Sequence, residues 1–313
     1  MIITVTLNAA LDITYEVADL ALWGSHRVSA VRQRAGGKGV NVASVLSTFG
    51  IAVTATGLVG GGTGAAIRAD LDARGVRHAF GDCAGESRRT VNVVSTASGD
   101  ATIFNEPGPV VTAGEWRSFT SWLDGLVRES GADVVVASGS LPPGAPVDAY
   151  AQIVELVRAR NARCVVDADG EPLRRALAAG PDVVKPNLAE LRAVTGVAAP
   201  LRGAAVLRRL GARDVVVSLG ADGVLVVPAD GPAYRAAAGQ RLAGNPTGAG
   251  DAAVAAIAAG LARGHDWPRV MGEVVGWSAA AVLSRVAGEV RPVEAARLAA
   301  MVRIEETDDA GKA

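Results

Sequence analysis

Short apolar runs alternate with longer segments of helical periodicity over most of the chain. Residues 2–7 form a β-branched run with the length of a buried strand, too short for a core helix. A second strand pattern at 52–60 follows a helical pattern that stops at Gly50. Later helical patterns, most of them ahead of buried strands, cover residues 65–74, 115–129, 147–161 and 203–210. This order predicts an α/β fold: a doubly wound, mostly parallel sheet with helices on both faces.

Two stretches depart from this order, because apolar and polar residues nearly alternate in them. Residues 12–33 resemble strands with one wet face, and residues 88–106 resemble a hairpin. We expect them to form a small discontinuous β-sheet lid whose apolar face lies over the site. The α/β core then comprises residues 1–11, 34–87 and 107–313. Any apolar lid face left uncovered predicts a homodimer through the lids.

Composition and charge exclude several classes of partner. The 313 residues are 50% hydrophobic and 20% charged, with a formal net charge of -1. This balance gives no electrostatic reason to expect nucleic acid or an anionic membrane as partner. The two cysteines, Cys83 and Cys164, lack metal-ligand spacing and fit a reducing compartment. The N-terminus lacks signal-peptide features and no apolar run could span a bilayer, so we expect a cytoplasmic protein.

A turn of small residues precedes an apolar helical run late in the chain. Thr247, Gly248, Ala249 and Gly250 make up this turn, and Asp251 opens the run. Unpaired backbone N–H groups and the helix dipole favour an anion such as phosphate at this position. An acid placed there suits a general base toward a hydroxyl that attacks a phosphoryl group. An ordinary N-cap is the alternative role for Asp251, and this stretch alone leaves both open.

Five motifs in a fixed order carry a family resemblance. They are AGGKGVNVA at 35–43, SGSLPPG at 138–144, KPNLAEL at 185–191, SLGADG at 218–223 and NPTGAGDAAVA at 245–255. The first and last resemble the two signatures of the ribokinase-like, or PfkB, family of carbohydrate kinases, and the other three fall in that family's order. The opening TLNAALDITYEV and FNEPGP at 104–109 resemble the branch that contains 1-phosphofructokinase and tagatose-6-phosphate kinase.

The resemblance implies a sugar site on the lid side of the core. Its expected substrate-binding residues are Asp12, Gly37, Lys38, Asn41 and Ser138. Lys38 lies between glycines, where the backbone can approach a sugar closely and a cation can meet a phosphate.

Arginines of the lid point to a phosphorylated sugar. Arg27 lies in the first insertion, and Arg88 and Arg89 open the second, so folding the lid is expected to gather cations at one mouth of the site. Either Arg88 or Arg89 resembles the family's phosphate-contacting arginine. Two charge-assisted contacts would favour phosphorylated over free sugars by on the order of 10².

The nucleotide site is expected from residues at other strand ends. The implied ATP-binding residues are Lys185, Asn187, Ser218, Gly220, Gly223, Thr247, Gly248 and Gly250. Asn187 and Glu190, three apart at a helix start, could hold hydrated Mg²⁺ or could form a capping pair. A late helix over 277–286 is expected to wall the adenine, although core packing would explain it nearly as well.

The motifs together predict an ATP-dependent phosphohexose kinase, with fructose 1-phosphate as first substrate and fructose 1,6-bisphosphate as product. Tagatose 6-phosphate, fructose 6-phosphate or a free sugar are alternative substrates. A non-catalytic sugar-binding protein is an alternative class, but it has no use for an acid in an anion site. The segments 60–65 and 248–253 fit the weak dinucleotide pattern, whereas the P-loop pattern is absent.

Overall fold

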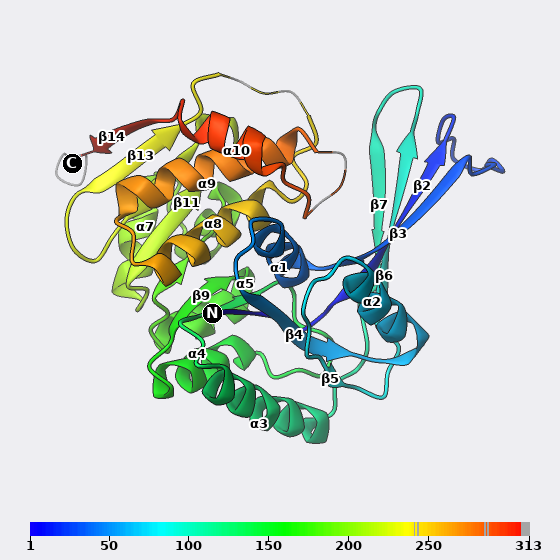
Figure 1. The fold of residues 1–313 in the computed structure, drawn as a ribbon, viewed down its shortest axis with the longest axis horizontal. Helices are drawn as coiled ribbons and strands as arrows, with labels where there is room; N and C mark the ends of the chain where they lie inside the picture. Colours follow the sequence, from blue (N-terminus) through cyan, green and yellow to red (C-terminus); the bar gives the residue numbers. More distant parts are fainter. Residues whose placement is uncertain (241, 243, 285, 287, 308–313) are drawn as a thin grey trace.

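The computed structural model describes residues 1–240, 242, 244–284, 286 and 288–307. The central feature of the described residues is a ten-stranded sheet (Figure 1). The strands are β1 Ile2–Thr6, β4 Val53–Val59, β5 Gly81–Asp82, β8 Val134–Ser138, β9 Arg163–Asp167, β10 Val183–Val184, β11 Asp214–Ser218, β12 Val224–Val227, β13 Ala233–Ala237 and β14 Arg303–Thr307. Their order across the sheet is β14-β13-β12-β11-β10-β9-β8-β1-β4-β5. Pairing is parallel from β5 to β11 and antiparallel from β11 to β14.

Helices cover both faces of this sheet, as the alternating pattern predicts. One face carries α1 Lys38–Thr48, α2 Gly61–Ala73, α8 Ala249–Arg263, α9 Trp267–Val282 and α10 Pro292–Ala299. The other carries α3 Ala113–Ser130, α4 Ala149–Ala159, α5 Gly170–Ala178, α6 Leu188–Thr195 and α7 Pro200–Arg209. Successive strand residues contribute to opposite cores, since Ile2 packs in the first and Ile3 in the second. The predicted fold class is confirmed.

Several helix boundaries differ from the predicted ones. The helix predicted at 203–210 begins at Pro200, where the fixed proline φ suits the first helical position. The helix predicted at 277–286 begins ten residues earlier, after Asp266, whose side chain caps the Arg269 N–H, and it ends at Val282. The long apolar composition of α9 concealed this start, because a helix buried on most sides shows no stripe.

A second sheet of four strands projects beside the main body (Figure 1). It consists of β2 Ala10–Val17, β3 Ala30–Gly36, β6 Arg88–Ser95 and β7 Ala101–Asn105, in the order β3-β2-β6-β7. The two insertions therefore do meet in one sheet. Its strands reach slightly beyond the predicted range 12–33, and the domain boundaries themselves stay a prediction.

The polar face of this lid carries the candidate site residues Asp12 and Arg88. Asp12 pairs with Thr90, which pairs with Asn105, so these three side chains share one face. The next row, Ile13 with Val91 and Phe104, lies on the opposite face. The lid face that carries Asp12 is therefore polar, and not the apolar face that was expected over the site.

Helix α2 holds both lid segments. The Ala35 N–H, near the end of β3, donates to Asp70 Oδ2 at 2.9 Å. Just before β6, the Glu86 carboxylate accepts from the N–H groups of Gly62 and Thr63 at the start of α2. The two strand entries into the core thus share one rigid support.

Candidate active site

Helix α8 begins at the predicted glycine-rich turn. Gly248 is its N-cap residue and has the left-handed φ of 86°, which favours glycine. Asp251 lies inside the first turn, and the helix has no side-chain cap hydrogen bond. The N-cap alternative for Asp251 is therefore wrong. The helix is buried from Asp251 to Gly260, so the acid is held by a rigid core element.

The Asp251 carboxylate lies in a buried and charged environment. Only 8% of the residue is exposed, and Asn41 Nδ2 donates to its Oδ2 at 2.8 Å. Burial, followed by the negative charge of Asp167, raises the pKa of Asp251 to about 7. The Asn41 hydrogen bond and the charges of Lys38 and Lys185 oppose this rise. A carboxyl group that titrates near neutrality is well matched to general-base chemistry.

Asp167 connects two lysines at the carboxyl end of β9. Its Oδ1 lies 3.4 Å from Lys38 Nζ and 3.4 Å from Lys185 Nζ. The Asp167 side chain is 2% exposed, so this carboxylate is part of the interior of the site. No motif singled it out. The available signal was its position after the apolar run of β9, at the edge of the sheet where ligands bind in such folds.

Lys38 is the first residue of α1, and its ammonium group points toward the buried carboxylate of Asp167. Besides Asp167, it lies 3.9 Å from Glu190 Oε1. Burial tends to lower the pKa of Lys38, but the charges of Asp167, Glu190 and Asp251 outweigh it, so that the pKa is raised. Lys38 is therefore a charged group held among carboxylates, not a freely solvated lysine.

The backbone N–H groups of Gly248, Ala249 and Gly250, at the start of α8, are the ones expected to stabilise a transferring phosphoryl group. The Ala249 N–H donates to Pro246 O at 3.2 Å and is used within the turn. A Cβ at Gly250 would lie 3.7 Å from Lys185 Nζ, so the lysine and the helix start face the same space. Upstream, the Thr247 N–H donates to Asn245 Oδ1 at 3.0 Å. Ala249 and Thr247 therefore need another arrangement of the turn to donate to a ligand.

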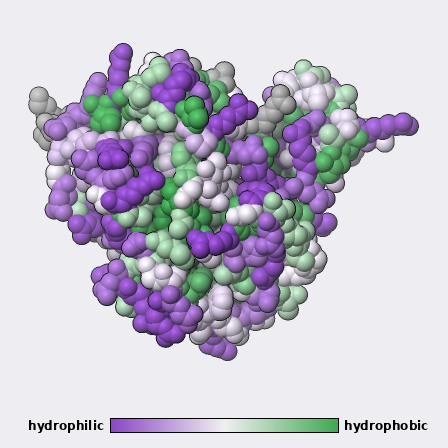
Figure 2. All heavy atoms as spheres, in the orientation of Figure 1, coloured by the Kyte–Doolittle hydropathy of each residue, from purple (hydrophilic) through white to green (hydrophobic). Residues whose placement is uncertain are grey.

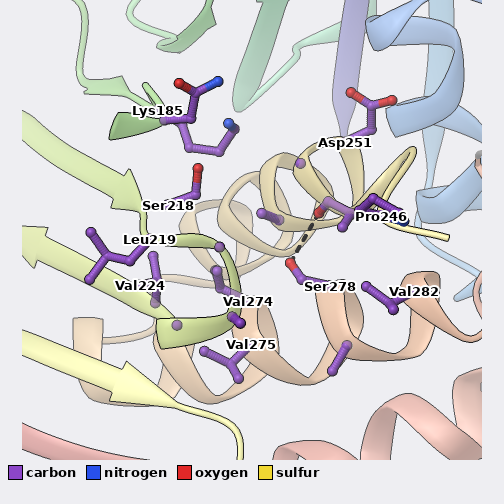
Figure 3. A pocket seen from close by; sticks show the side chains of 18 of the residues that line it. Lys185, Ser218, Leu219, Val224, Pro246, Asp251, Val274, Val275, Ser278 and Val282 are labelled. Atoms are coloured by element: carbon purple, nitrogen blue, oxygen red, sulfur yellow. Dashed lines mark hydrogen bonds between the residues drawn. The ribbon is translucent and has the colours of Figure 1, made fainter. Parts of the chain in front are cut away.

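A cavity of about 880 Å³ extends from Asp251 along α8 and α9 (Figure 3). Its charged end contains Lys38, Asp167, Lys185, Glu190 and Asp251. Its far end is apolar, with Leu219, Val224, Leu242, Val274, Val275, Ala279 and Val282. A long cavity with one charged and one apolar end matches a molecule that joins phosphates to an aromatic base.

The predicted nucleotide loop lines this cavity. Ser218 ends β11, Gly220 begins a short 3-10 turn, Gly220–Asp222, and Gly223 follows that turn. A Cβ at Gly223 would come within 2.0 Å of the Ala236 carbonyl oxygen, so this position requires glycine. Helix α9 forms the opposite wall, as expected of the late helix.

Asn187 and Glu190 form the capping pair that was the alternative to a metal site. Asn187 Oδ1 accepts from the Glu190 N–H at 2.9 Å, and Glu190 Oε2 accepts from the Asn187 N–H at 2.8 Å. Glu190 Oε1 is left facing Lys38. The pair therefore fixes α6 at the cavity and leaves one carboxylate oxygen for a further ligand.

Asp12 lies on the polar face of the lid beside the core. Burial raises its pKa to about 6, while a hydrogen bond with Thr90 and the charges of Arg88 and Arg34 oppose the rise. A Cβ at Gly36 would come within 2.0 Å of Asp12 Oδ2, so the AGG motif leaves room for this carboxylate. Next to it, Gly37 has a φ of 101°.

Arg88 and Arg89 point to opposite sides of β6. Arg88 is on the face of Asp12, and its Nε donates to the Asn8 carbonyl oxygen at 3.0 Å. Arg89 instead forms an ion pair with Glu106 at 3.1 Å. Of the two arginines, Arg88 is the one aligned with the candidate sugar site.

Of two other predicted sugar-site residues, one lies far out on the lid and the other is buried. Arg27 is exposed in the turn beyond Glu16 and Ser29, at least about 13 Å along β2 from Asp12 at 3.3 Å per residue. Within one chain, the structure therefore does not gather Arg27 with the other cations. Ser138 ends β8 but is fully buried, and its hydroxyl has no hydrogen-bond partner among the described residues.

The helix start at residues 60–65 is already occupied by the protein. The Glu86 carboxylate caps α2, and a Cβ at Gly61 would lie 1.9 Å from Glu86 Oε2. A dinucleotide pyrophosphate would meet this negative charge at the position it must occupy. The second dinucleotide-like segment, 248–253, contains the buried Asp251. Neither segment therefore forms a Rossmann site.

Comparison with known proteins places this geometry in one family. Residues 5–292 match the model of the pfkB family carbohydrate kinases. The chain belongs to the pfkB family. It is 39% identical over 269 residues to 1-phosphofructokinase of Xanthomonas campestris pv. campestris, covering 83% of each chain. It is 35% identical over 269 residues to tagatose-6-phosphate kinase of Staphylococcus epidermidis, covering 83% of this chain and 85% of that one.

A solved structure of the same family supports the whole fold. Phosphofructokinase-2 of Escherichia coli, in complex with potassium, superposes with a TM-score of 0.89 at 30% identity, covering 96% of this chain and 98% of that one. The sequence resemblance to PfkB kinases is thus confirmed, and the enzyme class is that of a phosphotransferase acting on a carbohydrate.

The described residues contain neither a helix that could span a membrane nor a metal-binding cluster. No described helix has the combined length and apolar character needed to cross a bilayer. Among these same residues, no group of three or more His, Cys, Asp or Glu side chains is arranged to hold a metal ion.

Proposed function

We propose that this pfkB-family chain transfers the γ-phosphoryl group of ATP to a hydroxyl of a phosphohexose, with fructose 1-phosphate as first substrate. Fructose 1,6-bisphosphate is then the product. The observation that carries the proposal is the buried Asp251, which lies in the first turn of α8 at the charged end of the cavity.

The transfer uses groups that the fold already places together. The sugar hydroxyl gives its proton to Asp251 as its oxygen bonds to the γ-phosphorus, and the bond from that phosphorus to the bridging oxygen of ADP breaks. Because such a transition state is loose, positioning and charge neutralisation contribute more than strong basicity. Lys38 and Lys185 supply positive charge beside Asp251, and the N–H groups at the start of α8 add their dipoles.

The charged and apolar ends of the cavity support ATP as its ligand. Its base would lie in the apolar part against α9, and its phosphates would lie toward Lys185 and the loop that contains Ser218, Gly220 and Gly223. Packing of an aromatic base against Val275 and Ala279 needs no specific polar partner, which suits a site built mainly from aliphatic side chains.

Of the two predicted Mg²⁺ ligands, the structure leaves one in a position to bind the ion. Glu190 Oε1 is a hard oxygen ligand that the capping pair leaves available, whereas Asn187 Oδ1 is used within the cap. Magnesium in kinases is held mainly by nucleotide phosphates and water with one or two carboxylates, so a protein cage is not required. When bound, the ion would be held near Glu190 and would offset part of the negative charge of the nucleotide phosphates.

Recognition of a phosphorylated sugar rests on the lid. Arg88, with its guanidinium on the polar face beside Asp12, can form a charge-assisted contact with the sugar phosphate. The similarity to 1-phosphofructokinase and tagatose-6-phosphate kinase supports a phosphohexose over ribose or free fructose. Comparing kcat/KM for fructose 1-phosphate, fructose 6-phosphate, tagatose 6-phosphate, fructose and ribose tests this order. A free sugar with the highest value would contradict it.

The decisive test of the chemistry is Asp251→Asn. It should lower kcat by roughly 10² to 10⁴ while ATP binding, measured by calorimetry, is largely kept. Asp266→Asn at the start of α9 is the matched control, since asparagine also caps a helix and the position is remote from the cavity. Wild-type turnover in Asp251→Asn would overturn the base assignment, and intact sugar binding without ATP turnover in the wild type would favour a non-catalytic sugar-binding protein.

A homodimer through the lids is the state we infer. The apolar lid face is covered near α2 but leaves Val31 and Phe104 more than half exposed, at 55% and 57%. Figure 2 shows hydrophobic residues gathered on the lid. A second copy could bury this face. Val31→Lys with Phe104→Lys should give a monomer in light scattering, and a wild-type monomer at micromolar concentration with full activity would contradict the proposal.

Both cysteines are free, which is consistent with a cytoplasmic location.

A further inference from the structure

Asn41, the fourth residue of α1, faces Asp251 across the contact between α1 and α8. Its Nδ2 donates to Asp251 Oδ2 at 2.8 Å, and each of the two residues is 8% exposed. One oxygen of the carboxylate is therefore fixed by a protein donor. The other oxygen, Oδ1, is left for a substrate hydroxyl.

The backbone at Gly288, far from Asn41 in the sequence, keeps the Asn41 side chain in this orientation. Gly288 has a φ of 74°, and a Cβ there would lie 3.0 Å from Asn41 Oδ1 and 3.3 Å from Asn41 Cα. The space beside the amide is thus filled by main chain at a position that favours glycine.

We propose that Asn41 is a positioning residue for phosphoryl transfer, which holds Asp251 with one carboxylate oxygen free to take the proton. This rests on the proposed function of Asp251 as base. It differs from the sugar contact that the family resemblance implies for Asn41, because the amide nitrogen is already engaged with the carboxylate.

The charged groups around Asp251 allow the two roles to be separated. The charged residues that face it are Asp167 of β9, Lys38 of α1 and Lys185 after β10. Asn41 is the neutral member of this group, and its hydrogen bond favours the ionised carboxylate. Removing the bond should therefore raise the pKa of Asp251. Loss of a sugar contact alone would raise KM and leave this pKa in place.

The first test is the pH dependence of kcat at saturating ATP and fructose 1-phosphate. Asn41→Ala should lower kcat by about tenfold to a hundredfold, the usual range for one hydrogen bond to a charged group. Its acid limb should move to higher pH, since the protonated base is inactive. Asn41→Asp is isosteric, so it tests the proposal even if the alanine variant does not fold, and its added negative charge should move the limb further. Ser44→Ala, which removes another buried polar group of α1, should leave the limb in place.

The second test is a double-mutant cycle with Asp251→Asn. If Asn41 acts through Asp251, adding Asn41→Ala to Asp251→Asn should change kcat by less than about threefold, because the base is already lost. Multiplied losses, or a raised KM for fructose 1-phosphate with an unmoved acid limb, would overturn the proposal. Wild-type turnover in Asp251→Asn alone would instead overturn the proposed function, so the two failures are distinguishable.

Discussion

Lys185 Nζ lies 3.4 Å from Asp167 Oδ1, and both side chains are almost fully buried, with 5% and 2% exposed. A buried ammonium group is costly without a partner, and the same carboxylate also contacts Lys38. Asp167 therefore holds two positive charges beside the position that the γ-phosphate takes in the proposed reaction, while its own charge acts on Asp251.

Replacing Asp167 should change both effects. In Asp167→Asn the lysines lose their shared negative partner, so kcat/KM for ATP should fall by about tenfold or more. The like charge that raises the pKa of Asp251 is also lost, so the acid limb of kcat should move to lower pH. Steady-state kinetics across pH 5 to 9 measures both. Asp182→Asn, which changes an acid that accepts from the Cys164 N–H, is the control, and an upward shift of the limb would contradict the prediction.

The two lid arginines form a matched pair for substrate recognition. Arg88→Ala should lower kcat/KM for fructose 1-phosphate by about 10² with little change for free fructose, because only the phosphorylated sugar offers a charge-assisted contact. Arg89→Ala breaks the exposed ion pair with Glu106 and should have a small effect. Equal losses in the two variants would argue against a special role for Arg88.

Gly36 should be intolerant of any side chain. In Gly36→Ala the new methyl group would overlap the Asp12 carboxylate, so KM for the sugar phosphate should rise while the KM for ATP stays near the wild-type value. Gly125→Ala in α3, where a Cβ meets no atom within 4 Å, is the control and should be neutral or stabilising. An unchanged sugar KM in Gly36→Ala would show that Asp12 does not bind the sugar.

The ionised carboxylate of Asp251 should lower the free energy of unfolding of the protein above neutral pH. Its pKa rises from 3.8 to about 7 on folding, so between these values the folded state binds a proton that the unfolded state does not. Stability from this group is therefore lost as pH rises toward 7 and stays lower above it. Asp251→Asn should raise Tm relative to wild type by on the order of a few °C at pH 8 and much less at pH 4.5. A Tm difference independent of pH, measured by calorimetry, would contradict this origin.

Local sequence was enough for the order of elements and for the loops at the strand ends. The turn before Asp251 and the loop around Gly223 both line the cavity. Their turns could be predicted locally, because glycine at left-handed φ marks a tight turn or a close approach of the backbone. The sequence could not decide between Arg88 and Arg89, since their sides depend on how β6 pairs with β2, a strand more than 70 residues away.

The contacts around Asp251 also could not be predicted from the sequence motifs. Asn41 and Asp251 belong to different signatures, and each resembles a ligand-binding residue when taken alone. Their hydrogen bond follows only from the packing of α1 against α8. Asp167 lies in a polar segment that was recognised at a strand end but was given no role, because a role follows only from the two lysines that the sheet brings to this acid.

The Asn41 to Asp251 hydrogen bond joins residues that are 210 positions apart in the chain. During synthesis the N-terminal strands and α1 leave the ribosome long before α8 exists, and contacts of such long range form late and slowly. A nascent chain thus carries the lid and the first glycine motif well before it contains Asp251. Truncated products that lack the last 70 residues therefore keep Asp12, a residue of the proposed sugar site, in their sequence but lack Asp251, the proposed base.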